Sequence, residues 1–188
     1  RHPNAAIACP VHAEEEGGRN RIPRALAAYA AKALGMRLDD DIVQIVRAHH
    51  TGKDAFFRLT HRALFDGKVE AGKEYILVDD HITQGGTINE LRNYIENNGG
   101  RVVDVFSLTA SQGSTILKPS EGQLADLRVR YGDELGQLLE YGDIAADPSA
   151  ITASEAAYIL KLSPDTFRNR VAEARRERLV EGDDGGVR

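Results

Sequence analysis

Short apolar runs separated by longer amphipathic segments dominate the first 110 residues, and this alternation predicts an α/β fold. The runs are 5–9, 42–46, 75–78 and 102–106. Between the first two, apolar residues recur at helical spacing, and Gly35 ends the pattern. This stripe, of the kind that packs against a core, consists of Ile22, Ala25, Leu26, Tyr29, Ala30, Ala33 and Leu34. Strand, helix and strand over 5–46 predict a βαβ unit, hence a parallel sheet with a right-handed crossover.

The stretch from Tyr75 to Thr87 carries the most informative pattern. Its apolar run predicts a buried strand, and two carboxylates, Asp79 and Asp80, stand where that strand is expected to end. The residues of the following loop are Thr83, Gln84, Gly85, Gly86 and Thr87. An apolar stripe then predicts a helix over about 87–98, stopped by two glycines. With the strand at 102–106, this second unit completes a doubly wound parallel sheet.

This succession of strand, loop and helix can hold a sugar phosphate. Amide groups of the loop and of the helix N-terminus are donors for a phosphate. Carboxylates accept hydrogen bonds from vicinal hydroxyls, or hold a hydrated Mg²⁺. Ligands of doubly wound sheets bind at the carboxyl ends of the strands, where Asp79 and Asp80 stand.

The segment 47–73 is basic and has no clear periodicity. Its basic residues include Arg47, His49, His50, Lys53, Arg58, His61, Arg62 and Lys68. One interpretation is an antiparallel hairpin that covers an edge of the sheet. The other is a flap that closes over an anionic ligand. The two interpretations are compatible, and composition alone does not separate them.

Beyond Ser111 the chain is predicted to be helical. The expected helices are 121–130, 134–141, a short one opened by a capping box at 152–155, and a longer one from 163 to about 179. The turn at 147–149 is a candidate linker. We therefore divide the chain into an α/β domain, 1–146, with its flap at about 47–73, and a helical hairpin with a polar tail, 147–188.

The helical hairpin has two interpretations. Its short helix, tight turn and second helix resemble a helix-turn-helix, in which Arg168, Asn169 and Arg170 would face DNA. Many helical hairpins share this pattern, and Glu173 and Glu177 dilute the basic face. A hood over the ligand site at the carboxyl ends of the strands, or a dimer contact, is therefore favoured over DNA binding.

The composition excludes several classes of protein. With 188 residues, 41% apolar and 28% charged, the chain is typical of a soluble globular protein, and it has no apolar run long enough to span a membrane and no signal-peptide pattern. The net charge of −5 disfavours nucleic acid as the default partner. The single Cys9 lies in an apolar run, which predicts a buried, inert thiol and a cytoplasmic protein. No histidine and cysteine spacing indicates zinc.

Tyr75 to Thr87 resembles the phosphoribosyl pyrophosphate (PRPP) motif of type I phosphoribosyltransferases, in which two acids and a T-x-G-G-T loop follow an apolar strand. Ile7 to His12, then Gly18-Arg19-Asn20 before an alanine-rich helix, is similar to the competence protein ComF branch of that family. Arg47 and Thr51-Gly52 resemble the flexible loop of the same branch. The resemblance covers about 5–110 and leaves the C-terminal third unassigned.

The resemblance implies a role for each matched residue. Asp79 and Asp80 would bind the ribose hydroxyls of PRPP, directly or through Mg²⁺. The loop of Thr83, Gln84, Gly85, Gly86 and Thr87 would wrap the 5-phosphate. Arg19 would stand at the pyrophosphate, and the flap would close on it with cations drawn from Lys53, Arg58, His61 and Arg62. The family also predicts a homodimer.

Two departures from the family pattern limit the substrate. Thr83 stands where the purine-salvage branch has an aspartate that assists the reacting nitrogen of the base. Its absence weakens the hypothesis that this protein salvages hypoxanthine or guanine. His81 stands where the family is usually apolar; it is either a half-buried residue bonded to the backbone or a proton donor or base contact. His12 is more often a loop residue than a catalyst.

The sequence therefore predicts a Mg²⁺-dependent transferase that moves ribose 5-phosphate from PRPP to an unidentified nitrogenous small-molecule acceptor and releases pyrophosphate. The alternative is a regulator without catalysis. It would bind PRPP or a nucleotide and act through the C-terminal helices on DNA or on a protein partner.

Overall fold

The computed structural model describes residues 5–12, 21–46, 55–111 and 116–183. The chain divides into two compact units, each described by itself below. The first unit comprises 1–48 and 63–115, and the second comprises 49–62 and 116–188. The helical unit thus begins at 116 rather than at the expected 147, and it takes in part of the basic segment.

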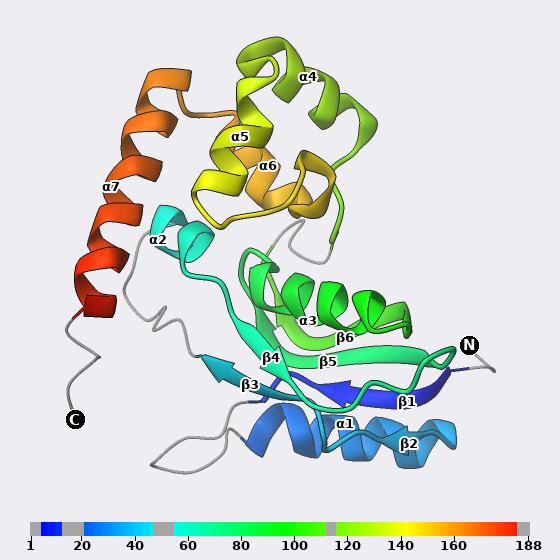
Figure 1. Cartoon of the computed structure of the whole chain (residues 1–188). Coiled ribbons are helices and arrows are strands. Elements are labelled where there is room, and N and C mark those ends of the chain that lie inside the picture. Colours follow the sequence, from blue (N-terminus) through cyan, green and yellow to red (C-terminus); the bar gives the residue numbers. More distant parts are fainter. Residues whose placement is uncertain (1–4, 13–20, 47–54, 112–115, 184–188) are drawn as a thin grey trace. The chain divides into compact units, whose positions relative to one another are not determined.

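The first unit is an α/β structure with a parallel four-stranded sheet in the order β2-β1-β5-β6. Its elements are β1 (Ala5–Pro10), α1 (Arg21–Leu34), β2 (Arg37–Leu38), β3 (Val43–Val46), β4 (Leu64–Asp66), β5 (Glu74–Ile82), α3 (Gly86–Asn97) and β6 (Arg101–Ala110). Helix α1 covers one face of the sheet and α3 the other, so the predicted doubly wound fold is confirmed (Figure 1). The central strands supply the core, because Ile7 to Cys9 and Tyr75 to Val78 are all buried.

The strand predicted at 42–46 exists, but the predicted partner is wrong. β3 pairs antiparallel with β4 in a separate two-stranded sheet, and the parallel partner of β1 is the two-residue strand β2. The turn after β2 explains the difference. The Asp39 carboxylate accepts hydrogen bonds from the backbone amides of Asp41 and Ile42, at 2.9 and 3.0 Å, which turns the chain out of the parallel sheet.

Helix α1 packs on the sheet through small residues, so the predicted orientation of its apolar stripe is wrong. Ala27 and Ala31 are buried against β1 and β5. From the stripe, Ile22 is 54% exposed and Tyr29 is 73% exposed. An alanine-rich helix has two apolar faces, and periodicity cannot choose between them. The contact with Ala8 favours the smaller side chains, because they let the helix lie close to the strand.

The second unit is helical. Its elements are α2 (Ala55–Thr60), α4 (Glu121–Tyr131), α5 (Glu134–Tyr141), the 3₁₀ turn η1 (Pro148–Ala150), α6 (Ala153–Ile159) and α7 (Pro164–Asp183). The expected capping box is present, with the Thr152 hydroxyl accepting from the Glu155 amide at 3.1 Å and Glu155 accepting from the Thr152 amide at 2.7 Å. None of the described helices is long and apolar enough to cross a membrane.

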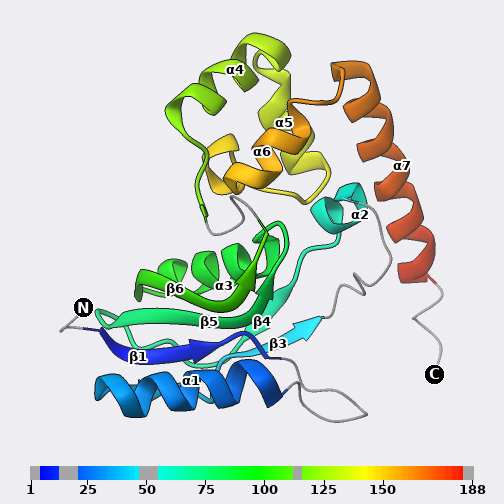
Figure 2. The same cartoon turned by 180° about the vertical axis from the view of Figure 1, so that it is seen from behind.

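Phe167 of α7 lies at the centre of the second unit and is fully buried. Its ring meets Phe56 of α2 and Tyr131 of α4 edge to face, with centroids 6.1 and 5.7 Å apart. Helix α2, from the basic segment, lies beside α7 (Figure 2). The part of the expected flap that the structure describes as a helix is therefore packed into the helical core.

Candidate functional site

A small cleft forms where β5 passes into α3. It is lined by Asp79, His81, Ile82, Thr83, Gly85, Gly86, Thr87 and Ile88 and has a volume of about 40 Å³. Complete ligand pockets measure about 300–1,000 Å³, so the cleft has room for a phosphate-sized group, and a larger ligand would extend outside it. The structure thus brings Asp79 and four of the five predicted loop residues together; Asp80 and Gln84 are not among the lining residues.

The two carboxylates at the end of β5 differ in their access to the cleft. Asp79 lines the cleft and Asp80 does not, although the two side chains lie close enough to interact directly. Asp79 accepts a hydrogen bond from the Asp80 amide at 2.9 Å. Of the two carboxylates, Asp79 is therefore the one that can contact a ligand inside the cleft.

Burial raises the pKa of Asp79 to about 7, and the charge of Asp80 adds to the increase, against the opposing effect of the Asp80 amide. Its ligand-free state near neutral pH is thus divided between the acid and the carboxylate. A cation or a donor in the cleft would favour the carboxylate.

This pKa predicts how the stability of the ligand-free protein depends on pH. Between the unfolded value of about 3.9 and the folded value of about 7, the folded protein holds a proton that the unfolded chain does not. Stability should therefore fall as the pH rises from about 4 to about 7, and Asp79→Asn should flatten this part of the profile. Urea unfolding at several pH values measures it, with Asp126→Asn on the exposed face of α4 as the control. Parallel profiles for the wild type and Asp79→Asn would contradict a desolvated Asp79.

The loop before α3 is shaped to receive an anion. Gly85 precedes the first helical residue with φ of 77°, a left-handed conformation that favours glycine. No side chain caps this end of the helix. The first amides of α3 have no partners within the helix, and with Gly86, Thr87 and Ile88 lining the cleft they can donate to a phosphate.

The two carboxylates at the end of β5 could hold Mg²⁺ together with ligands from a bound phosphate. Among the described residues, no group of three or more histidine, cysteine, aspartate or glutamate side chains could hold a metal. Proteins commonly hold Mg²⁺ through one or two carboxylates together with substrate phosphates. Asp79 and Asp80 suit that mode of binding.

Of the four arginine and lysine residues assigned to the pyrophosphate, two lie in the part of the chain that the structure describes. Arg19 and Lys53 lie outside the described residues. Arg58 is half-buried on α2 in the second unit. Arg62 forms an ion pair with Glu155 of α6 at 2.9 Å, and the two side chains are only 8% and 3% exposed. The expectation that Arg62 is a free cation of the flap is therefore corrected, since a buried glutamate holds its charge.

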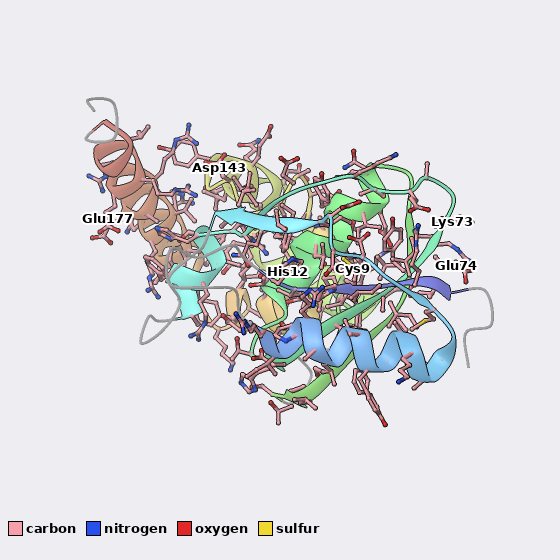
Figure 3. The ribbon with its side chains drawn as sticks, turned by 90° about the horizontal axis from the view of Figure 1, so that it is seen from below. Cys9, His12, Lys73, Glu74, Asp143 and Glu177 are labelled. Atoms are coloured by element: carbon pink, nitrogen blue, oxygen red, sulfur yellow. The ribbon has the colours of Figure 1, made fainter. Side chains whose placement is uncertain are left out.

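Cys9 lies in β1 and His12 just after it, and both side chains are buried. Cys9 is fully buried and burial raises its pKa well above the usual value, which fits the inert thiol expected. His12 is also buried, with Nδ1 3.3 Å from the Pro10 carbonyl, and its Nε2 has no hydrogen-bond partner among the described residues. Figure 3 shows His12 toward one end of the sheet and Lys73 and Glu74 at the other, as parallel strands require.

His81 is exposed at the cleft, and sequence reasoning missed its partner. Its Nδ1 is 2.7 Å from Oγ1 of Thr109 on the neighbouring strand β6. A strand at 101–110 was predictable, and its carboxyl end had to lie near Asp79. The register that sets Thr109 opposite His81 was not predictable.

Two arginines of α7 that were candidates for DNA contact form hydrogen bonds within the second unit. Arg168 donates to both carboxylate oxygens of Glu134, at 2.6 and 2.8 Å, and Arg170 donates to the Tyr158 hydroxyl at 3.0 Å. A free arginine face for DNA is therefore lacking at these positions. Phe167, on the same helix, is enclosed in the helical core.

Comparisons with known proteins give distant relatives. The chain matches no family model. It is similar to protein TraN of Escherichia coli, 37% identical over 174 residues, which cover 89% of this chain and 38% of TraN. The chain thus spans less than two fifths of that relative. It is also similar to HGPRTase-like protein 1 of Haloarcula marismortui, 24% identical over 111 residues, which cover 56% of this chain and 60% of that protein. Among solved structures, a purine phosphoribosyltransferase from Pyrococcus horikoshii superimposes with a TM-score of 0.40 at 12% identity, covering 60% of this chain and 76% of that one.

Proposed function

We propose that the first unit binds PRPP and, with Mg²⁺, transfers its ribose 5-phosphate to a nitrogenous small-molecule acceptor with release of pyrophosphate. The observation that carries the proposal is the cleft in which Asp79 and a glycine-threonine loop meet the N-terminus of α3. The motif from Tyr75 to Thr87 and the HGPRTase-like name of a 24% identical relative support it. The narrower resemblance to the ComF branch, the cytoplasmic location and the homodimer remain predictions.

Each group of residues has a role in this proposal. Amides and hydroxyls of the loop that includes Gln84 hold the 5-phosphate and fix the position of the sugar. Asp79 and Asp80 accept hydrogen bonds from the ribose hydroxyls. Mg²⁺, when bound by these carboxylates and the diphosphate, would neutralise the charge of the leaving group. The bond from the anomeric carbon to the pyrophosphate oxygen breaks, a carbon–nitrogen bond forms, and the departing pyrophosphate takes up the proton of the acceptor nitrogen.

The cations that face the pyrophosphate form the least constrained part of the proposal. Arg62 is committed to Glu155. We propose Arg19, which belongs to the first unit, as a cation at the pyrophosphate, and the roles of Lys53 and Arg58 stay predictions of the family resemblance. The regulator without catalysis is not favoured by a specific observation, because the α7 arginines that would contact DNA are paired within the second unit.

Two measurements test the proposal. Calorimetry should show PRPP binding that requires Mg²⁺ and is much tighter than the binding of ribose 5-phosphate. Pyrophosphate release should follow when one base from a panel of adenine, hypoxanthine, guanine, uracil and orotate is added. Failure to bind PRPP would refute the proposal. Tight binding with silence across a broad panel would favour a PRPP-binding regulator.

A further inference from the structure

The end of β5 and the end of β6 share a hydrogen-bonded side-chain pair beside the cleft. His81 and Thr109 lie opposite each other in register, and both are exposed. The Nδ1 of His81 is 2.7 Å from the Thr109 Oγ1. That hydroxyl is in turn 3.3 Å from the Asp80 carbonyl oxygen, to which it donates. The three groups form a short chain that runs from the imidazole to the backbone of the acidic pair.

The direction of these hydrogen bonds determines which nitrogen of His81 carries the proton. When both hydrogen bonds form at once, the single Thr109 hydroxyl proton must go to Asp80, because a carbonyl can only accept. Oγ1 must then accept from His81, which places the imidazole proton on Nδ1. A neutral imidazole has one N–H group, and its Nε2 is therefore an acceptor.

The position of His81 relates this acceptor to a ligand. Residues 79, 81 and 83 lie at alternate positions along the chain and all line the cleft. The amides of α3 supply donors at the phosphate end, and Asp79 and His81 supply acceptors on the strand side. Because the cleft is no larger than a phosphate, the remainder of a ligand must extend past its exposed rim, where His81 lies.

We propose that His81 is a specificity-determining residue whose Nε2 accepts a hydrogen bond from an N–H group of the acceptor base, and that Thr109 is the positioning residue that keeps Nε2 in the accepting form. The inference rests on the proposed function, and it adds the chemical class of the acceptor: a neutral nitrogen heterocycle with an N–H donor. An acceptor fully substituted at nitrogen would leave Nε2 without a partner.

The tautomer of His81 tests the structural basis without any substrate. Protein labelled with ¹⁵N-histidine, at a pH where the ring is neutral, should show a protonated Nδ1 and a bare Nε2 in long-range ¹H–¹⁵N spectra. Thr109→Val keeps the shape but removes the hydroxyl, and should release this preference, whereas Thr109→Ser should preserve it. A wild-type His81 protonated at Nε2 would overturn the inference.

The same resonance tests the ligand. With PRPP and Mg²⁺ present, at least one base of the panel should shift the Nε2 signal in the wild type and in Thr109→Ser, but not in Thr109→Val. For that base, His81→Phe should raise KM at least tenfold and change kcat less than threefold. An Nε2 signal that no base moves, in a protein that binds PRPP, overturns the inference and leaves the proposed function standing. A wild type that fails to bind PRPP refutes the proposed function itself, and the tautomer measurement then decides the hydrogen-bond chain alone.

Discussion

Replacing both carboxylates, as in Asp79→Asn with Asp80→Asn, is expected to abolish Mg²⁺-dependent PRPP binding, with a loss of at least about a hundredfold in affinity. The substitutions keep the shape of the side chains but remove the only two acids at the end of β5. Folding should survive, because burial already raises the pKa of Asp79 to about 7 and favours its neutral form. Calorimetry with PRPP and Mg²⁺ measures the loss, and urea unfolding checks the fold.

The two single variants divide this effect between the carboxylates. Asp79 lines the cleft, whereas Asp80 is not among its lining residues. Asp79→Asn should therefore cost more affinity than Asp80→Asn. Unchanged affinity in the double variant would remove the central claim that this cleft receives the ribose of PRPP.

Replacing Arg62 with methionine should destabilise the second unit by about 3–5 kcal/mol, the cost of leaving a buried charge without its partner. Glu155 is 3% exposed and makes its ion pair with Arg62 at 2.9 Å. The same carboxylate caps α6 through the Thr152 amide, so the disturbance should reach the start of that helix. Denaturant unfolding measures the change.

A second substitution separates this role from ligand binding. Arg62→Met combined with Glu155→Gln removes the uncompensated charge and keeps an acceptor at the cap, so most of the lost stability should return. Arg176→Met, on the exposed surface of α7, serves as the control and should change stability by less than about 1 kcal/mol. If Arg62→Met is stable but binds PRPP more weakly, the result would contradict the structural role and support Arg62 as a ligand of the pyrophosphate.

The parts of this fold that were predictable depend on residues near one another in the sequence. The β5–loop–α3 segment joins an apolar strand, two acids, two glycines and a helical stripe, and each of these has a local physical meaning. The helices α4 and α5 and the capping box at Thr152 were predictable for the same reason.

The parts that were not predictable depend on distant partners. β2 is only two residues long, too short for a periodic signal, so β3 was assigned its place in the sheet. Both faces of α1 are apolar, and only the close contact with Ala8 and Val78 selects the alanine face. Nothing local to Arg62 marks Glu155, 93 positions later, as its partner. The site follows the same rule, because its loop was predictable and Thr109 was not.

The placement of α2 has a consequence for how this protein can be divided. The chain passes between its two units at 48/49, 62/63 and 115/116. A single cut after 115 would therefore leave Phe56 and Leu59 attached to the sheet without the helices that bury them. The helical unit is consequently not a cassette that recombination could exchange at one junction. A new helical unit must arrive with its own version of residues 49–62, so the two segments are bound to be inherited together.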